Sequence, residues 1–121
     1  FETLYCMSRE LFWRLGCFSA AAAVTLGAFG AHALKARIND PRLIKNWETA
    51  TLYHFIHSIG LLCVAVAPKF SKNAGFCMIG GIAVFSGSLY TLVLTNQRWL
   101  GAITPIGGVC MIGAWVFLSW G

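Results

Sequence analysis

The sequence predicts an all-α integral membrane protein, a four-helix bundle made of two helical hairpins in a single domain over residues 1–121. Its composition is the first observation, because hydrophobic residues make up 58% of the chain and charged residues only 11%. A typical soluble domain has about 25% charged residues. The second observation is that the apolar residues fall into four nearly uncharged stretches of about 18 to 21 residues, enough to cross ~30 Å of hydrocarbon as a helix. These stretches are residues 15–34, 50–67, 75–95 and 102–120.

The first two helices are expected at approximately residues 11–34 and 41–67. Asp40 and Pro41 indicate where the second helix begins, because aspartate is a favoured N-cap and proline fits the first helical position. Charged residues alternate with apolar ones over residues 41–49. We therefore expect this segment to lie at the membrane interface before the helix enters the bilayer.

The third and fourth helices are expected at approximately residues 75–95 and 102–120. Pro68 and the short polar turn after it end the second helix, so that the second and third helices run in opposite directions. Thr104 and Pro105 are typical of a helix start. A helix that began at Pro105 would be short for a crossing, so a kinked extension back to residue 102 is the alternative.

The basic residues lie in short segments that flank the apolar stretches, where they would contact anionic lipid headgroups. They form no patch large enough for a nucleic acid, although the net charge is +5. Both termini, Phe1 and Gly121, are expected on one side of the membrane. The positive charges are divided almost equally between the two sides, so they do not predict an orientation.

Small residues recur at spacings of three and four along the first and third predicted helices. Such spacing lets a neighbouring helix approach closely in a membrane. We therefore expect seven glycines at helix–helix contacts: Gly16, Gly27, Gly30, Gly80, Gly87, Gly107 and Gly108.

The sequence contains no recognisable set of catalytic residues, and we therefore expect that the protein is not an enzyme. No Asp or Glu follows Glu48, so proton relays and paired-carboxylate sites within the later helices are excluded. The five cysteines are scattered and form no C-x-x-C pair, which argues against a disulfide framework and against zinc. We predict no catalytic residue and no metal site.

Three histidines are the remaining candidates for chemistry. His32 lies near the end of the first predicted helix, and His54 and His57 stand three apart in the second, with His54 about 9 Å inward from Glu48. We expect all three to lie toward one face of the membrane, with Tyr53 and Tyr90 as further candidates for binding a ligand. Haem ligation, or a pocket for a quinone or lipid headgroup, is one hypothesis.

The other hypothesis is that His54 and His57 are neutral groups at interface depth, which hydrogen-bond the second helix to the first and third. Ser58, Thr51, Tyr53, Tyr90 or a backbone carbonyl would supply their partners. We favour this interpretation, with no cofactor beyond structural lipids.

Four motifs together resemble one known family: GAFGAHALK (27–35), WETATLYHFIHSIGLL (47–62), FSGSLYTLVLT (85–95) and WLGAITPIGGVCMIGAW (99–115). The chain is similar, over about residues 11–121, to small four-helix membrane proteins of unknown function. This family includes bacterial inner-membrane proteins and eukaryotic transmembrane protein 256. The resemblance implies a four-helix membrane protein with no assigned chemistry, and an association of its eukaryotic members with mitochondria.

These features predict a non-catalytic accessory subunit of a larger, respiratory-type membrane complex. The expected partners are the lipid bilayer and other membrane subunits. The mitochondrial inner membrane is the favoured location, and the start at Phe1 rather than methionine fits an imported organellar protein. Another organelle or a bacterial inner membrane is the alternative location. The alternative function is a small membrane protein that binds a lipid, quinone or haem near His32, His54 and His57.

Overall fold

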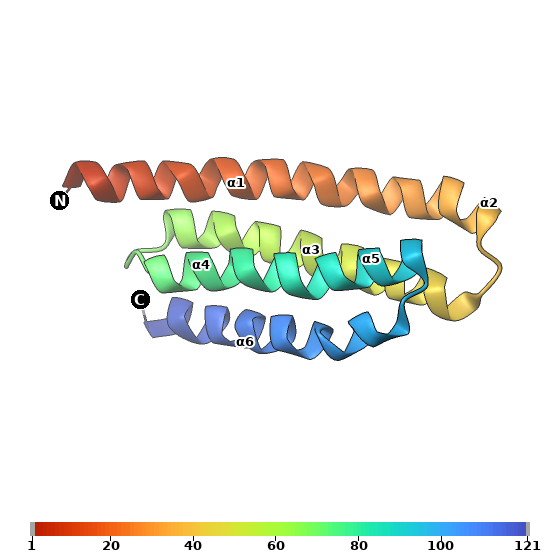
Figure 1. Ribbon diagram of the computed structural model, residues 1–121. Helices are drawn as coiled ribbons and strands as arrows, with labels where there is room; N and C mark the ends of the chain where they lie inside the picture. The colour runs from red at the N-terminus through yellow and green to blue at the C-terminus, as the bar shows by residue number, and fades with distance from the viewer. Residues whose placement is uncertain (1, 121) are drawn as a thin grey trace.

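The computed structural model describes residues 2–120 and confirms the predicted fold class. Every regular element in this range is helical, and the long helices cross the molecule in alternating directions (Figure 1). Four segments are long and apolar enough to span a membrane, with mean hydropathy between 1.5 and 1.8. They are Cys6–Arg37, Pro41–Val66, Lys72–Thr95 and Arg98–Trp120.

Helix α1, Glu2–Phe29, begins well before Leu11, so the predicted start of the first helix is wrong. No glycine or proline occurs in the chain before Gly16, and good helix formers (Glu, Leu, Met and Arg) make up about half of this stretch. The helix therefore extends without a break toward the N-terminus. At its other end it continues through a π-helical turn, η1 (Gly30–Leu34), into the short α2 (Lys35–Arg37).

Helix α3, Pro41–Val66, begins at the cap that the sequence indicates. The backbone amide of Arg42 donates a hydrogen bond of 2.9 Å to Asp40 Oδ1. One of the orphan donors of the first turn is thereby satisfied. The helix ends just before Pro68, which cannot donate a helical hydrogen bond.

The third span consists of three segments and begins slightly earlier than predicted. Ser71 caps it, because Ser71 Oγ accepts a hydrogen bond of 3.2 Å from the amide of Ala74. The helical path then contains a π-helical turn in its middle, which widens the backbone there. The segments are α4 (Lys72–Gly81), η2 (Ile82–Ser86) and α5 (Gly87–Thr95).

The fourth span combines a 3₁₀ turn, η3 (Arg98–Ala102), with the 17 residues of α6 (Thr104–Trp120). The alternative extension toward residue 102 is therefore present as a 3₁₀ turn. It lengthens the span to 23 residues, which is enough to cross the hydrocarbon.

The spans pack as two pairs, α1 along α3 and α4 with η2 along α6, and α3 also contacts α4, η2 and α5. Helix α1 begins and α6 ends at the same end of the bundle (Figure 1). Phe1 and Gly121, which are predicted to share one side of the membrane, lie outside the described residues.

The interior has a polar middle between two apolar clusters. The first cluster surrounds Phe12, Leu61 and Met78, near the start of α1 and the end of α3. The second surrounds Trp47, near the start of α3, and Leu92, near the end of α5. The residues between the two clusters form the site described below.

Three of the seven predicted packing glycines lie where a side chain would not fit. A Cβ at Gly16 would come within 2.7 Å of Leu62, and one at Gly30 or Gly107 would overlap Trp47 or the backbone of Phe85. Gly108 makes only an ordinary van der Waals approach to Phe85, at 3.8 Å.

For Gly27, Gly80 and Gly87, the prediction of a close contact with another helix of this chain is wrong. A Cβ added at any of the three would meet no atom within 4 Å. Spacing defines a helix face but does not say which way that face turns, and at these three half-buried positions the space that a Cβ would occupy is open. The sequence analysis missed Gly60, Gly75 and Gly81, where an added Cβ would come within 3 Å of Met78, Phe12 and Met111, respectively.

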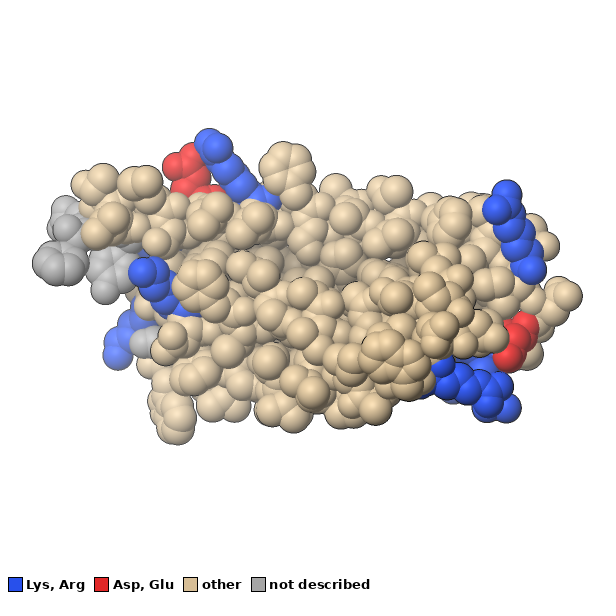
Figure 2. Space-filling model, viewed as in Figure 1, with Lys and Arg blue, Asp and Glu red and all other residues tan. Residues whose placement is uncertain are grey.

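Charged side chains lie toward the two ends of the face shown in Figure 2, and the middle of that face carries none. One ion pair at each end joins oppositely charged residues: Arg14 with Glu10 at 2.6 Å, and Lys35 with Glu48 at 3.6 Å. This distribution fits a molecule whose middle lies in hydrocarbon and whose ends lie among headgroups.

Candidate functional site

The polar middle contains a chain of hydrogen bonds that joins three spans. His54 on α3 contacts Tyr90 on α5 through Nδ1, at 2.9 Å from the phenol oxygen. Its other ring nitrogen, Nε2, lies 3.0 Å from Ser19 Oγ on α1. Ser19 Oγ in turn lies 2.6 Å from Ser58 Oγ, and the Ser58 hydroxyl donates to the His54 carbonyl oxygen at 2.6 Å.

The number of available protons fixes the direction of every hydrogen bond in this network. Each serine hydroxyl has a single proton, and that of Ser58 is used on a carbonyl, which can only accept. Ser19 must therefore donate to Ser58, and its own oxygen must accept from His54 Nε2–H. The neutral imidazole then has a bare Nδ1, which accepts the hydroxyl proton of Tyr90.

His57 has the opposite tautomer. Its Nδ1 lies 2.7 Å from the carbonyl oxygen of Tyr53, an acceptor, so the ring proton must be on Nδ1. Trp115 Nε1–H on α6 donates to the bare Nε2 at 3.1 Å. His54 thus connects α3 to α1 and α5, whereas His57 connects α3 to α6.

Both histidines are buried and have all their ring nitrogens in use. Only 7% of His54 and 5% of His57 is exposed. Among the described residues, no buried side-chain nitrogen or oxygen lacks a hydrogen-bond partner. Buried polar groups are costly unless they are paired, and this layer satisfies that requirement completely.

His54 and His57 lie deeper than predicted. His54 stands midway between Pro41 and Val66, the two ends of α3. It faces Ser19, which is itself far from Lys35 along α1 and η1. The position of His54 along α3 does not support interface depth, because that prediction counted inward from Glu48 alone, whereas Pro41 and Val66 lie almost equally far from His54.

The π-helical turn η2 supplies a second set of bonds beside this layer. Ser86 Oγ donates to the Ala50 carbonyl oxygen on α3 at 2.8 Å. Ser88 Oγ lies 2.9 Å from the Phe85 carbonyl oxygen and 2.6 Å from Thr104 Oγ1 on α6. Widened turns of this kind free backbone groups for outside partners and recur at functional sites.

The structure brings together some of the predicted site residues but not all. Tyr90 and a backbone carbonyl are hydrogen-bond partners as expected. The ring of Tyr53 stacks on Phe85, with 4.7 Å between centroids. His32 is exposed in η1 and has no part in the polar layer. The expected grouping of His32 with His54 and His57 is therefore wrong.

Ser19 and Trp115 are the members that the sequence analysis missed. Ser19 is a lone hydroxyl residue between a phenylalanine and four alanines. That isolation is the signal that could have found it, because an unpaired hydroxyl is unfavourable in hydrocarbon. Trp115 gave no such signal, since tryptophan near a helix end is also typical of an interfacial anchor.

This geometry does not suit haem or a metal ion. Bis-histidine ligation needs free imidazole nitrogens on two facing helices, whereas both buried histidines are on α3 and their nitrogens are engaged. Among the described residues, no group of three His, Cys, Asp or Glu side chains could hold a metal. All five cysteines are free.

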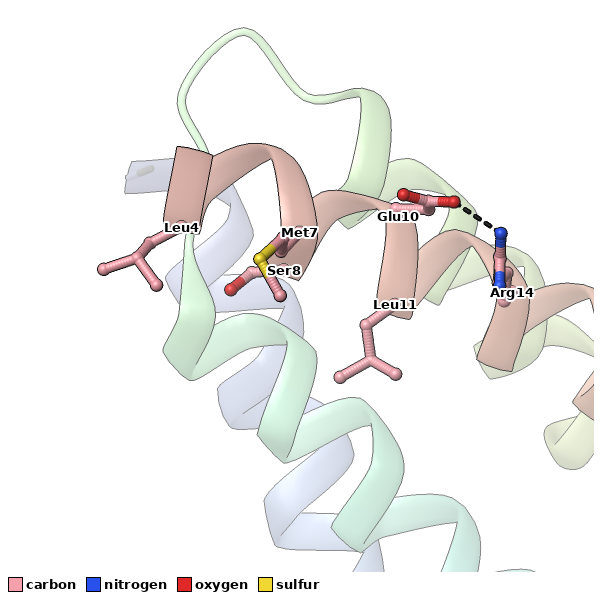
Figure 3. Close-up of a pocket in the computed structure, with 6 residues that line it drawn as sticks. All are labelled: Leu4, Met7, Ser8, Glu10, Leu11 and Arg14. Carbon is pink, nitrogen blue, oxygen red and sulfur yellow. Dashed lines mark hydrogen bonds and ion pairs between the residues drawn. The ribbon is translucent and has the colours of Figure 1, made fainter. Parts of the chain in front are cut away.

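Two surface grooves accompany the site without reaching it. One of about 570 Å³ runs along the start of α1, where Leu4 and Leu11 line it and Glu10 pairs with Arg14 at its edge (Figure 3). Its lining comes from a single helix. Another of about 480 Å³ lies between α1 and α3 beside Gly27. Neither groove is lined by His32, His54 or His57.

The fold and the site define a class: a small polytopic helical membrane protein with a closed polar layer in its middle. Residues 26–108 match the family described as "Protein of unknown function (DUF423)". The chain belongs to this family, and the resemblance seen in the sequence is confirmed.

Its relatives include bacterial and fungal proteins. The chain is 45% identical to the UPF0382 membrane protein YwdK of Bacillus subtilis, over 90% of this chain and 93% of the relative. It is 46% identical to the UPF0382 membrane protein SAB0533 of Staphylococcus aureus, over 90% and 92%. It is 37% identical to the UPF0382 membrane protein C1782.12c of Schizosaccharomyces pombe, over 85% and 93%. No solved structure matches the chain.

Proposed function

We propose that this chain is a non-catalytic accessory subunit that packs into a larger membrane assembly. The observation that carries the proposal is the closed polar layer: both ring nitrogens of His54 and His57 are used within the chain. A catalyst or ligand site needs polar groups that are free to meet a substrate. This interior holds its polar groups in fixed bonds between helices, which suits a structural role.

Open space beside three glycines supports the second half of the proposal. An added Cβ at Gly27, Gly80 or Gly87 would meet no atom within 4 Å, and a glycine in a helix interior costs about 1 kcal/mol relative to alanine in water. Small residues on a membrane helix permit the close approach of another helix. A partner subunit would give these three positions a use that the isolated chain does not.

A respiratory-type complex in an energy-transducing membrane is the setting that we propose. The relatives named above come from two bacteria and a fungus, and their names say only that they are membrane proteins. Bacterial plasma membranes and mitochondrial inner membranes both hold respiratory complexes. The proposed setting fits either location, and the mitochondrial assignment remains a prediction.

The test is native gel migration of the tagged chain, solubilised in mild detergent from cells that normally contain it. We expect a large complex for the wild type and loss of that complex in Gly27→Leu and Gly87→Leu. Each purified variant should unfold near the wild-type temperature, because an added Cβ at either position would meet no atom within 4 Å and Gly27 lines an open groove of about 480 Å³. Val24→Leu is the matched control, since Val24 is 60% exposed on α1 and already bulky.

Migration of the wild type as an isolated chain would overturn the proposal. So would a complex that persists in both glycine variants.

A further inference from the structure

A small polar hollow opens at the end of the bundle where α3 begins and α5 ends. Its volume is about 150 Å³, and its lining comes from both helices and from η3. Leu43 and Leu92 contribute apolar surface to it. Its other lining residues are polar: Asp40, Arg42, Asn46, Asn96 and Arg98.

The polar groups of this hollow have unused capacity to donate hydrogen bonds. In the described part of the chain, the guanidinium groups of Arg42 and Arg98 have no ion pair or hydrogen bond. The side-chain amides of Asn46 and Asn96 are likewise without partners there. Asp40 is the one acid of the lining, and its Oδ1 already accepts from the Arg42 backbone amide.

The charge of the hollow is therefore positive, with two guanidinium groups against one carboxylate. The helix ends do not change this balance, because the positive N-terminal end of α3 and the negative C-terminal end of α5 both border it. The positive charge of the two arginines would therefore attract an anion. Arginine is suited to phosphate because its planar group can donate two parallel hydrogen bonds.

We propose that this hollow binds the phosphate group of an anionic phospholipid. The location argues for a lipid, because the hollow lies where two membrane spans end and Trp99 beside it is 63% exposed, as in an interfacial anchor. The lining residues also favour a lipid, since hydrogen-bond donors lie beside apolar leucines. A phospholipid headgroup presents an anion next to hydrocarbon, which matches both kinds of surface.

The test is a lipid titration of the purified full chain in detergent, read by native mass spectrometry as the fraction that retains one lipid. The probes are phosphatidylglycerol, phosphatidylcholine and inorganic phosphate. We expect selective retention of phosphatidylglycerol, weakened roughly 25-fold or more in Arg42→Gln/Arg98→Gln. The matched control is Arg37→Gln/Lys45→Gln, which removes two exposed charges at the same end. It should weaken retention by no more than about 5-fold, because these exposed charges do not line the hollow and are screened by solvent.

Thermal unfolding of each variant establishes that the variant is folded. If the Arg42→Gln/Arg98→Gln protein does not fold, the single Arg98→Gln variant takes its place. Equal losses in the pocket and control variants would assign the effect to surface charge and overturn the proposal. Equal retention of phosphatidylcholine would also overturn it. Arginine-dependent binding of inorganic phosphate without selective retention of phosphatidylglycerol would assign the hollow to a free anion, and would overturn the lipid assignment.

Discussion

His54 and His57 lie one helical turn apart on α3 with their ring protons on different nitrogens. In His54 the proton is on Nε2, because the Ser19 hydroxyl donates to Ser58 and can only accept from the imidazole. In His57 it is on Nδ1, because the Tyr53 carbonyl accepts there and Trp115 donates to Nε2. Neighbouring copies of one residue type thus have different bonding roles, each set by its own hydrogen-bond partners.

The two tautomers can be observed directly by ¹⁵N nuclear magnetic resonance of protein labelled at histidine. We expect a protonated Nε2 for His54 and a protonated Nδ1 for His57, because carbonyl oxygens and indole N–H groups cannot exchange donor and acceptor roles. Tyr90→Phe removes the donor to His54 and should shift the resonance of His54 Nδ1 while leaving His57 unchanged. The same tautomer at both histidines would contradict the proton count.

Replacement of the histidines should separate their contributions to stability. His54→Leu leaves the Tyr90 hydroxyl without an acceptor and removes the hydrogen bond to Ser19 on α1, so we expect a loss of about 1–2 kcal/mol. His57→Leu removes one bond between helices, to Trp115, and should cost about 0.5–1 kcal/mol. His54→Gln keeps a donor and an acceptor and should be milder than leucine. Reversible unfolding in one detergent measures all three, and a larger loss for His57→Leu would contradict the assignment.

The extent of the spans could be predicted from sequence because it depends on local properties. Apolar length defines the crossings, and the cap formed by Asp40 before Pro41 follows from residue type and position alone. The start of α1 was placed too late because hydropathy falls before Leu11 although helix propensity does not. Hydropathy marks where a helix enters the membrane, whereas propensity marks where the helix begins.

The polar layer could be predicted only in part because it depends on the rotation and register of whole helices. Tyr90 was expected beside the histidines, whereas Ser19 comes from a helix whose depth relative to α3 no local pattern specifies. Gly27 and Gly30 show the same limit. They lie three residues apart on the first span, yet only Gly30 meets Trp47.

Arg9 should stabilise the pairing of α1 with α3 far more than Arg14. Its Nη1 donates to the carbonyl oxygens of Ala65 and Ala67, each at 3.0 Å, at the C-terminal end of α3. There a cation also interacts favourably with the helix dipole. We expect Arg9→Gln to lower the free energy of unfolding by about 1–2 kcal/mol. Faster hydrogen exchange in the last turn of α3 should accompany this loss.

Arg14→Gln is the control for that change. The Arg14–Glu10 pair is exposed, with side chains 68% and 59% accessible, and pairs of this kind contribute about 0.3–0.5 kcal/mol in water. Comparable losses for the two arginine variants would mean that the bonds to the α3 carbonyls do not stabilise the end of the helix.

Gly107 should tolerate a larger residue least, because α6 meets the backbone of η2 rather than a side chain at this position. A Cβ at Gly107 would lie 2.7 Å from Phe85 Cα and 2.8 Å from its Cβ, within the π-helical turn η2. At Gly60 an added Cβ would instead lie 2.8 Å from the terminal methyl of Met78, and a flexible thioether can move away. At Gly113 it would meet nothing within 4 Å.

These three positions therefore predict an order of stability for alanine variants. Gly107→Ala should cost about 1–3 kcal/mol, because two packed backbones must separate. Gly60→Ala should cost less, and Gly113→Ala should be neutral or slightly stabilising, because alanine favours a helix. Thermal unfolding of the three variants in the same detergent measures the order. A Gly107→Ala protein that unfolds at the wild-type temperature would mean that α6 does not pack this closely against η2, and the bond between Ser88 and Thr104 would then need another explanation.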